Sequence, residues 1–381
     1  MTIAQRVVAR LVSAAAAGAL LLMAPPSTFP GSVPVAAQTV ALKDIVPAGW
    51  LIGAAINQNQ SDERDGVAVD LITRQFSTIS PENLLKFQSV HSEPDRFTFD
   101  AADRYVAFGR ERGMAVIGHN LVWHSQTPRW VWDGPDGALA DRMTMLTRMR
   151  THIATVVGRY RGKILGWDVV NEALNEEGTL RESPWWRGIG DDYIAQAFTA
   201  AHEADPNAEL YYNDYNLATK PAKRAGAIRL IKELQQRGIR IDAVGEQGHW
   251  RLGTPTAGDV DQAITDLRAT GVKVMITELD VNLLAPAGAP APGQPPPPES
   301  NPYANGLPDD VQQALARYYA DAFRVLLTHR DDIARVTFWG VSDGDSWLNR
   351  GRVNYPLLWD RQRRPKPAFD EVVKVLMTWR P

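Results

Sequence analysis

The chain has 381 residues, of which 44% are hydrophobic and 22% charged, and its formal net charge is −3. This composition supports a large apolar core and excludes a disordered chain. The absence of cysteine excludes disulfides, thiolate metal sites, a cysteine nucleophile and a lipid anchor on an N-terminal cysteine. Because no basic run is present, we expect no binding to nucleic acid or to an anionic membrane.

The N-terminus has the pattern of a secretory signal peptide. Arg6 and Arg10 precede an apolar run over 11–24, and the sequence VAA at 35–37 offers a small-x-small cleavage site. We therefore expect residues 1–37 to be removed and the protein to be secreted or periplasmic. A buried first helix is the alternative, which the Pro-rich stretch after the run disfavours. No later apolar stretch is long enough to span a bilayer.

The remainder of the chain alternates short apolar or β-rich runs with amphipathic segments. The runs lie at 51–56, 76–79, 114–117, 164–170, 210–212, 243–244, 272–276 and 336–339. Two intervening segments have clear helical spacing, one from Ala225 to Leu234 and one from Val311 to Val325. Eight such βα units predict a single (β/α)8 TIM barrel over 38–381. An open doubly wound sheet is the alternative, but its usual Gly-rich phosphate turn is missing after the first run, where the chain reads IGAAINQNQ.

One segment interrupts this alternation. Residues 285–308 are too rich in proline to form a helix or a strand. The segment follows the seventh run, so we expect a long loop on the carboxyl-terminal face of the barrel. Because it lies between two barrel elements, we do not interpret it as a linker between domains.

Two of the predicted strands end on a glutamate. Glu172 follows the apolar run in ILGWDVVNEA, and Glu278 follows the apolar run in VKVMITELDV. An unpaired carboxylate inside a barrel strand is costly, whereas the carboxyl-terminal strand ends of a barrel carry the active site. The two glutamates would then face each other across one opening, which is the arrangement that glycosidases use. Capping or ion-pairing roles for both are the structural alternative.

Polar and aromatic residues follow almost every other predicted strand. They include Glu82, Asn83 and Lys86 in SPENLLK, His119, Trp123 and Gln126 in GHNLVWHSQ, Tyr215 in YNDYN, Gln247 and His249 in EQGHW, and Trp339 and Trp347 in FWGVSDGDSW. Sugars need hydrogen bonds around the ring edge and aromatic faces beneath the ring. The set therefore predicts a groove for a polyhydroxylated chain.

Several members of this set have plainer interpretations. Asn171 could cap the following helix, His119 and Tyr215 could be core residues, and Lys86 could be solvated. We expect His124 to support its loop, and Asp168 to make a buried hydrogen bond in mid-strand. Glu246 is expected to point away from the groove because side chains alternate along a strand.

The segments GHNLVWHSQTPRW, WDVVNEA, YNDYN, QGHW, ITELDV and FWGVSDGDSWL together resemble glycoside hydrolase family 10, the retaining barrel xylanases. The resemblance runs in order from about residue 51 to residue 369. It implies that Glu172 is the acid/base and Glu278 the nucleophile. It also implies that Asn171 bonds the sugar 2-hydroxyl and that His249 holds the nucleophile. Glu82, Asn83, Lys86, His119, Trp123 and Gln247 match sugar contacts, and Trp339 and Trp347 match aromatic walls.

The resemblance implies hydrolysis of internal β-1,4-xylosidic bonds of xylan by double displacement, without a metal or cofactor. We expect a monomer that binds xylan and xylo-oligosaccharides. A β-1,4-glucanase or a mixed xylanase and cellulase is the nearest alternative, because the sequence does not show how the site treats a 6-hydroxymethyl group. A metal-dependent barrel hydrolase and a catalytically silent carbohydrate-binding barrel are the alternatives from other classes.

Overall fold

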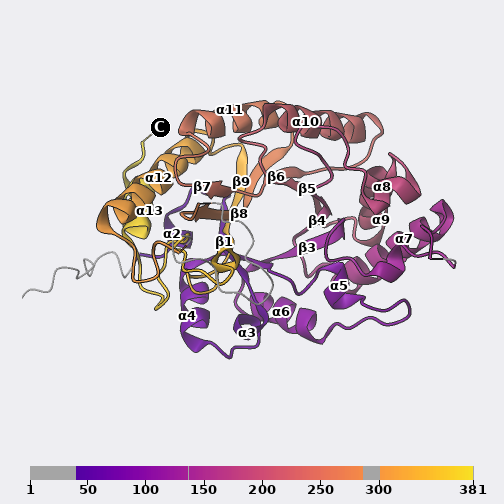
Figure 1. The fold of residues 1–381 in the computed structure, drawn as a ribbon, viewed down its shortest axis with the longest axis horizontal. Coiled ribbons are helices and arrows are strands. Elements are labelled where there is room, and N and C mark those ends of the chain that lie inside the picture. Colours follow the sequence, from indigo (N-terminus) through magenta and orange to yellow (C-terminus); the bar gives the residue numbers. More distant parts are fainter. Residues whose placement is uncertain (1–39, 136, 286–300, 381) are drawn as a thin grey trace, which may run out of the picture.

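The computed structural model describes residues 40–135, 137–285 and 301–380 (Figure 1). The predicted signal peptide and most of the predicted Pro-rich loop therefore lie outside the described residues. The flanks of that loop are described: Leu284 O accepts from Arg251 Nη2 at 2.7 Å, and Asn301 Oδ1 accepts from Val353 N at 2.8 Å.

Within the described residues, eight parallel strands close into a ring. They are β1 (Leu51–Ile56), β2 (Thr78–Pro81), β3 (Ala115–Trp123), β4 (Gly166–Asn171), β5 (Glu209–Asp214), β6 (Ala243–Glu246), β8 (Lys273–Asn282) and β9 (Ile333–Phe338). Each strand pairs with its neighbour in chain order, and the pairing of β1 with β9 closes the ring. A short additional strand, β7 (His249–Arg251), pairs with the carboxyl-terminal part of β8. The predicted single (β/α)8 barrel is thus confirmed.

Helices surround the ring of strands (Figure 1). The longer ones are α4 (Gly66–Gln75), α6 (Asp100–Glu111), α7 (Arg142–Arg159), α9 (Tyr193–Ala204), α10 (Pro221–Gln236), α11 (Ala257–Arg268), α12 (Asp309–Thr328) and α13 (Pro367–Thr378). Shorter ones are α2 (Leu42–Ile45), α3 (Gln58–Ser61), α5 (Phe87–Val90), α8 (Pro184–Ile189), η1 (Arg129–Val131) and η3 (Trp347–Asn349). No helix within these described stretches is long and apolar enough to cross a bilayer.

The sequence explains where individual helices begin. Asp141 accepts a hydrogen bond from Thr144 N at the start of α7, and Thr256 and Asp259 form a capping box at the start of α11. The two helices predicted from spacing lie within α10 and α12. In α10, however, Ala225 is exposed and the buried face includes Ala227 and Leu230, because a strict three-residue repeat drifts around a helix of 3.6 residues per turn.

The interior of the barrel is filled below its carboxyl-terminal end. Arg335 of β9 is only 2% exposed and donates from Nη1 to Ser80 Oγ of β2 at 3.1 Å. At Gly118 of β3 the missing side chain is required, because a Cβ there would lie 2.1 Å from the ring of Trp167. The barrel is therefore a packed core rather than a pore, and polar side chains can form a site only at its open end.

Candidate active site

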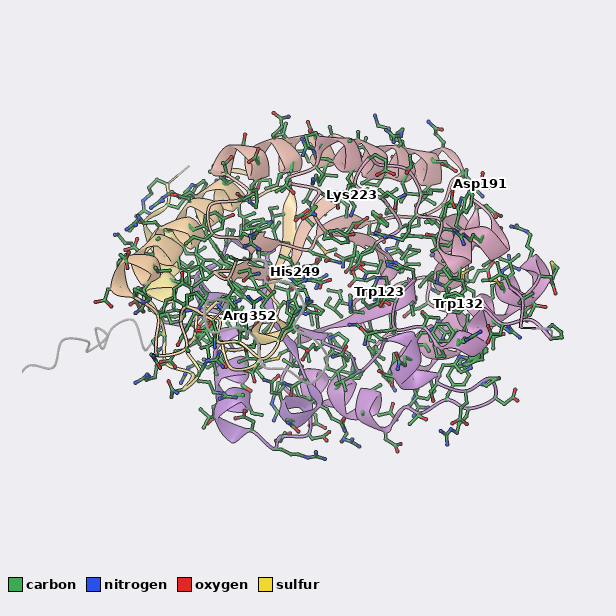
Figure 2. All side chains as sticks on the ribbon, in the orientation of Figure 1. Trp123, Trp132, Asp191, Lys223, His249 and Arg352 are labelled. Atoms are coloured by element: carbon green, nitrogen blue, oxygen red, sulfur yellow. The ribbon has the colours of Figure 1, made fainter. Side chains whose placement is uncertain are left out.

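A cavity of about 540 Å³ lies at the carboxyl-terminal ends of the strands. It is lined by every predicted site residue and by Asn216: Glu82, Asn83, Lys86, His119, Trp123, Gln126, Asn171, Glu172, Tyr215, Gln247, His249, Glu278, Trp339 and Trp347. Figure 2 labels Trp123 and His249 near the centre of the molecule, and they come from strands on different sides of the ring. The fold thus brings together residues that are spread over 266 positions of the chain, from Glu82 to Trp347.

Glu278 lies in β8 and is 4% exposed. Its Oε1 accepts a hydrogen bond from Asn213 Nδ2 at 2.8 Å, and its Oε2 lies 3.1 Å from His249 Nε2. Burial by itself would raise the pKa of Glu278. The hydrogen bond from His249, the electrostatic contributions of His119 and His249, and the hydrogen bond from Asn213 outweigh burial and lower this pKa to about 2. Glu278 is therefore held as a carboxylate.

His249 is held in turn by Asp280, two residues beyond Glu278 on the same strand. The Nδ1 of His249 lies 3.0 Å from Asp280 Oδ1, and Asp280 Oδ2 accepts from Trp347 Nε1 at 2.8 Å. Burial would lower the pKa of His249, but the carboxylates of Asp280 and Glu278 raise it to about 10. The ring is thus an imidazolium that donates from both nitrogens.

Glu172 directly follows β4, and its φ of +58° lies in the left-handed region. Its Oε2 accepts from Trp123 Nε1 at 2.9 Å, and its Oε1 accepts from Gln247 Nε2 at 3.0 Å. No histidine or arginine donates to its carboxyl oxygens among the hydrogen bonds of the described residues. The environments of the two glutamates therefore differ: neutral donors hold Glu172, whereas a charged donor holds Glu278.

An asparagine that the sequence interpretation missed connects the two halves of the site. Asn213 of β5 donates from Nδ2 to Asn171 Oδ1 at 2.9 Å and to Glu278 Oε1 at 2.8 Å. Its Oδ1 accepts from Thr277 Oγ1 at 2.6 Å, which fixes the orientation of the amide. Asn213 lies within YNDYN, but only its partners show that it supports the site, as is also true of Asp280.

The residues after β2 and β3 form one wall of the cavity. Lys86 Nζ donates to Asn83 Oδ1 at 3.0 Å and to Gln126 Oε1 at 2.8 Å, and it lies 5.0 Å from the centroid of the Trp123 ring. Burial lowers the pKa of Lys86 and raises the pKa of Glu82. Lys86 is 7% exposed, so the solvated alternative is wrong.

The other plain interpretations also have outcomes. Asp168 makes its expected buried hydrogen bond, with its Oδ2 at 2.9 Å from His119 Nδ1. Glu246 lies outside the cavity and accepts from Trp250 Nε1 and from the main chain of Ala218 and Gly248. Asn171 belongs to β4 and, like His119, lines the cavity rather than serving as a helix cap or a core residue.

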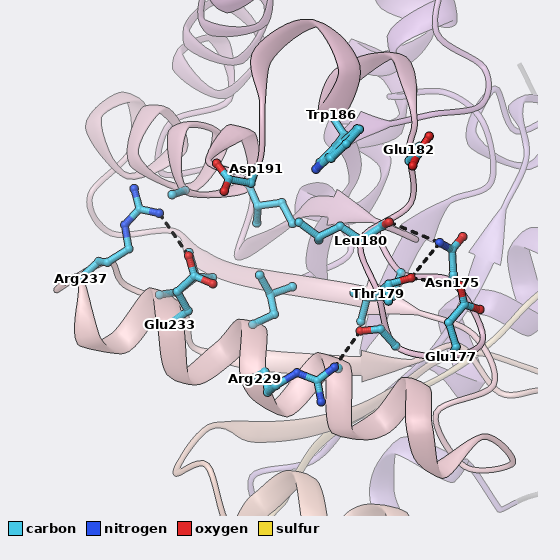
Figure 3. A pocket seen from close by; sticks show the side chains of 17 residues that line it. Asn175, Glu177, Thr179, Leu180, Glu182, Trp186, Asp191, Arg229, Glu233 and Arg237 are labelled. Atoms are coloured by element: carbon cyan, nitrogen blue, oxygen red, sulfur yellow. Dashed lines mark hydrogen bonds and ion pairs between the residues drawn. The ribbon is translucent and has the colours of Figure 1, made fainter.

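A second cavity, of about 800 Å³, lies outside the ring, between the β4–α8 connection, α9 and α10 (Figure 3). Although it is larger, it contains none of the predicted site residues. Its lining includes Trp186, Glu182 and Asp191 on one side, and on the other Arg229 of α10 and Arg237, which directly follows this helix. Among the described residues, no three His, Asp or Glu side chains are grouped so that they could hold a metal ion.

Comparisons with known proteins agree with this geometry. Residues 41–375 match the model of Glycosyl hydrolase family 10. The chain is 43% identical over 361 residues to Endo-1,4-beta-xylanase A of Xylanibacter ruminicola, with 90% of this chain and 95% of the relative covered. It is 39% identical over 344 residues to Endo-1,4-beta-xylanase of Geobacillus stearothermophilus, with 88% and 98% covered.

Solved structures are similar as well. An endoxylanase of family 10 from a sugarcane soil metagenome superposes with a TM-score of 0.83 and 40% identity, covering 88% of this chain and 99% of that one. An intracellular xylanase from Thermoanaerobacterium saccharolyticum, in complex with xylotetraose, has a TM-score of 0.78 and 33% identity and covers 87% and 97%. On the match of fold, sequence and nearly the whole length, the chain belongs to glycosyl hydrolase family 10.

Proposed function

We propose that this protein is an endo-1,4-β-xylanase that hydrolyses internal β-1,4-xylosidic bonds with retention of configuration. The observation that carries the proposal is the unequal treatment of two glutamates in one cavity. Glu278 is kept ionised, with a pKa of about 2, mainly by the His249 imidazolium. Among the described residues, in contrast, the carboxyl group of Glu172 accepts hydrogen bonds from neutral donors only. The substrate class is supported by the family and by the printed names of the relatives.

The mechanism follows from these positions. Glu278 Oε attacks the anomeric carbon while Glu172 gives its proton to the departing glycosidic oxygen, so that a glycosyl ester forms on Glu278. Glu172, now a carboxylate, takes a proton from water, and that water attacks the anomeric carbon and releases Glu278. Two displacements at one carbon return the original configuration.

Supporting residues prepare each glutamate for its role. Asn213 and His249 each bond one carboxyl oxygen of Glu278, so they keep the carboxylate in position as it attacks and loses its negative charge. Asn171 Oδ1 accepts hydrogen bonds from Asn213 and from Gln247, which also donate to Glu278 and Glu172 respectively. In this position Asn171 can bond the sugar hydroxyl next to the anomeric carbon. Trp339 and Trp347 supply aromatic surface in the same cavity.

One experiment tests the proposal directly. Initial rates are measured on xylan, carboxymethylcellulose and an aryl β-xylobioside, and the anomer formed first is followed by proton NMR. We expect xylan to be the preferred polymer and the β-anomer to appear first. A preference for carboxymethylcellulose would establish the glucanase alternative, and an α-anomer formed first would contradict retention.

We also propose that residues 1–37 direct export and are removed, and that the mature protein is a monomer. Export is proposed because the N-terminus has basic residues, then an apolar run, then a small-x-small cleavage site. N-terminal sequencing of the protein recovered from the culture medium or periplasm, followed by light scattering, tests both.

A further inference from the structure

We propose that Arg181, which does not line the cavity, is a positioning residue for the acid/base step. Its guanidinium would hold the main chain of Glu172 and the hydroxyl of Tyr215 in fixed relation. The inference rests on the proposed function, because it assigns the protonating role to Glu172.

The main chain at Glu172 requires support. Its φ of +58° is a conformation that residues with side chains rarely adopt, so the surrounding structure must impose it. On one side, Glu172 N donates to Asn213 O at 2.9 Å. On the other side, Glu172 O accepts from Arg181 Nε at 3.2 Å. Both main-chain polar groups of the proposed acid/base are thereby fixed, one by β5 and one by Arg181.

The same guanidinium reaches the cavity wall. Arg181 Nη2 donates to Tyr215 Oη at 3.0 Å and to Leu174 O at 3.2 Å. Lys223 Nζ also lies over the Tyr215 ring, 3.4 Å from its centroid. Because the planar guanidinium of arginine directs several N–H groups in fixed directions, the one side chain of Arg181 can bond Glu172 O, Leu174 O and Tyr215 Oη together. A lysine could not reproduce that geometry.

The segment that carries Arg181 is itself anchored. Residues 175–179 form a turn in which Asn175 N donates to Thr179 O at 2.9 Å. At the tip, Gly178 O accepts from Arg229 Nη2 of α10 at 2.9 Å, a bond drawn as a dashed line from Arg229 in Figure 3. Gly178 also packs so closely on α10 that a Cβ would lie 2.2 Å from Ala222 O. The connection after β4 is therefore held against α10 at Gly178. From there it runs back towards β4, which places Arg181 beside Glu172.

This arrangement has a specific chemical consequence. Trp123 and Gln247 fix the carboxyl end of Glu172, and Arg181 fixes its main chain, so the carboxyl group is aimed at the leaving oxygen from both ends. Loss of Arg181 should weaken protonation of the leaving group and leave the attack of Glu278 intact. The kcat/KM of a substrate whose leaving group needs no proton should then change little when Arg181 is replaced.

The test compares two aryl β-xylobiosides that differ only in leaving group. Arg181→Met should lower kcat/KM for the phenyl glycoside about 10- to 100-fold and for the 2,4-dinitrophenyl glycoside less than about threefold. With the dinitrophenyl substrate, azide should raise kcat of the variant, because azide attacks the glycosyl-enzyme without a general base. Arg187→Met is the matched control, since Arg187 is exposed on α8 and pairs only with Glu182 among the described residues; it should keep wild-type values.

Two outcomes would overturn the inference. Equal losses on both leaving groups would assign Arg181 a general structural role, and so would a lowered Tm with an unchanged dependence on leaving group. If Arg181→Met fails to fold, Arg181→Lys keeps the charge without the planar guanidinium and supports the same comparison. Wild-type protein that does not hydrolyse either xyloside would instead contradict the proposed function itself.

Discussion

His249 Nε2 lies 3.1 Å from Glu278 Oε2, and this contact opposes the effect of burial on the pKa of the proposed nucleophile. Replacing His249 by asparagine removes the positive charge and leaves Glu278 buried. We expect the chemical step to slow by roughly 10- to 1000-fold. The pKa of Glu278 should rise, so the acidic limb of the kcat/KM profile should move to higher pH.

A second histidine provides the control for this variant. His329 lies outside the cavity with its Nε2 2.7 Å from Asp261 Oδ1, so His329→Asn also breaks a contact between a histidine and an aspartate. That variant should keep the wild-type pH profile. If His249→Asn lost thermal stability while keeping its rate and profile, His249 would be a packing residue only.

The assignment of Glu278 as nucleophile predicts chemical rescue. Glu278→Ala should abolish turnover, because no glycosyl ester can form. Added azide can enter the space left by the carboxylate and attack the anomeric carbon in a single displacement. The product should be the inverted α-glycosyl azide, identified by NMR. A β-glycosyl azide from this variant would exclude Glu278 as the nucleophile.

The assignment of Glu172 predicts a different response. Glu172→Ala should retain kcat/KM on a dinitrophenyl xylobioside, whose leaving group needs no proton, and should lose it on xylan. The second step lacks its general base, so glycosyl-enzyme should accumulate and be detectable by mass spectrometry of the intact protein. If Glu172→Ala lowered kcat/KM equally for substrates with every leaving group, Glu172 would not be the acid/base.

The charge on His249 also predicts a change of stability with pH. Its pKa in the folded protein is about 10, above the ordinary value of 6.5, so the folded state retains the proton over this interval. The stabilisation is therefore complete below pH 6.5 and is lost as the pH rises towards 10. The free energy of unfolding in urea should fall by up to about 1.4 kcal/mol per pH unit more in wild type than in His249→Asn. Parallel curves for the two proteins would contradict a charged His249.

The barrel could be predicted because its apolar runs and helical segments alternate regularly, but the ends of its strands could not. The apolar runs from which two of the strands are predicted stop at Ile117 and Ile276, whereas β3 continues to Trp123 and β8 to Asn282. Polar residues at these ends normally indicate a loop, and here they remain in the sheet because they face a cavity and one another. The three residues of β7 were not predicted either, because so short a strand has no periodicity.

The candidate site could be predicted as a set because its members stand at strand ends in recognisable motifs. Asn216, which lines the cavity, was not predicted. The other residues missed bond groups of the protein itself: Asn213, Asp280 and, in the loop after β4, Arg181. Nothing in their spacing distinguishes them from ordinary polar residues. Their importance appears only when the partners are placed in three dimensions.

The pairing of β7 with β8 has a consequence for how this enzyme could diversify. His249 is in register with Asp280, and Glu278 lies two residues earlier on the same strand, so main-chain pairing within one sheet sets the surroundings of the proposed nucleophile. The main chain of the proposed acid/base, Glu172, is instead bonded by Arg181, which lies on a connection that contacts α10 through Gly178. If the proposed roles hold, exchange or lengthening of surface segments can change the surroundings of the acid/base, whereas the surroundings of the nucleophile are inherited together with the paired strands β7 and β8.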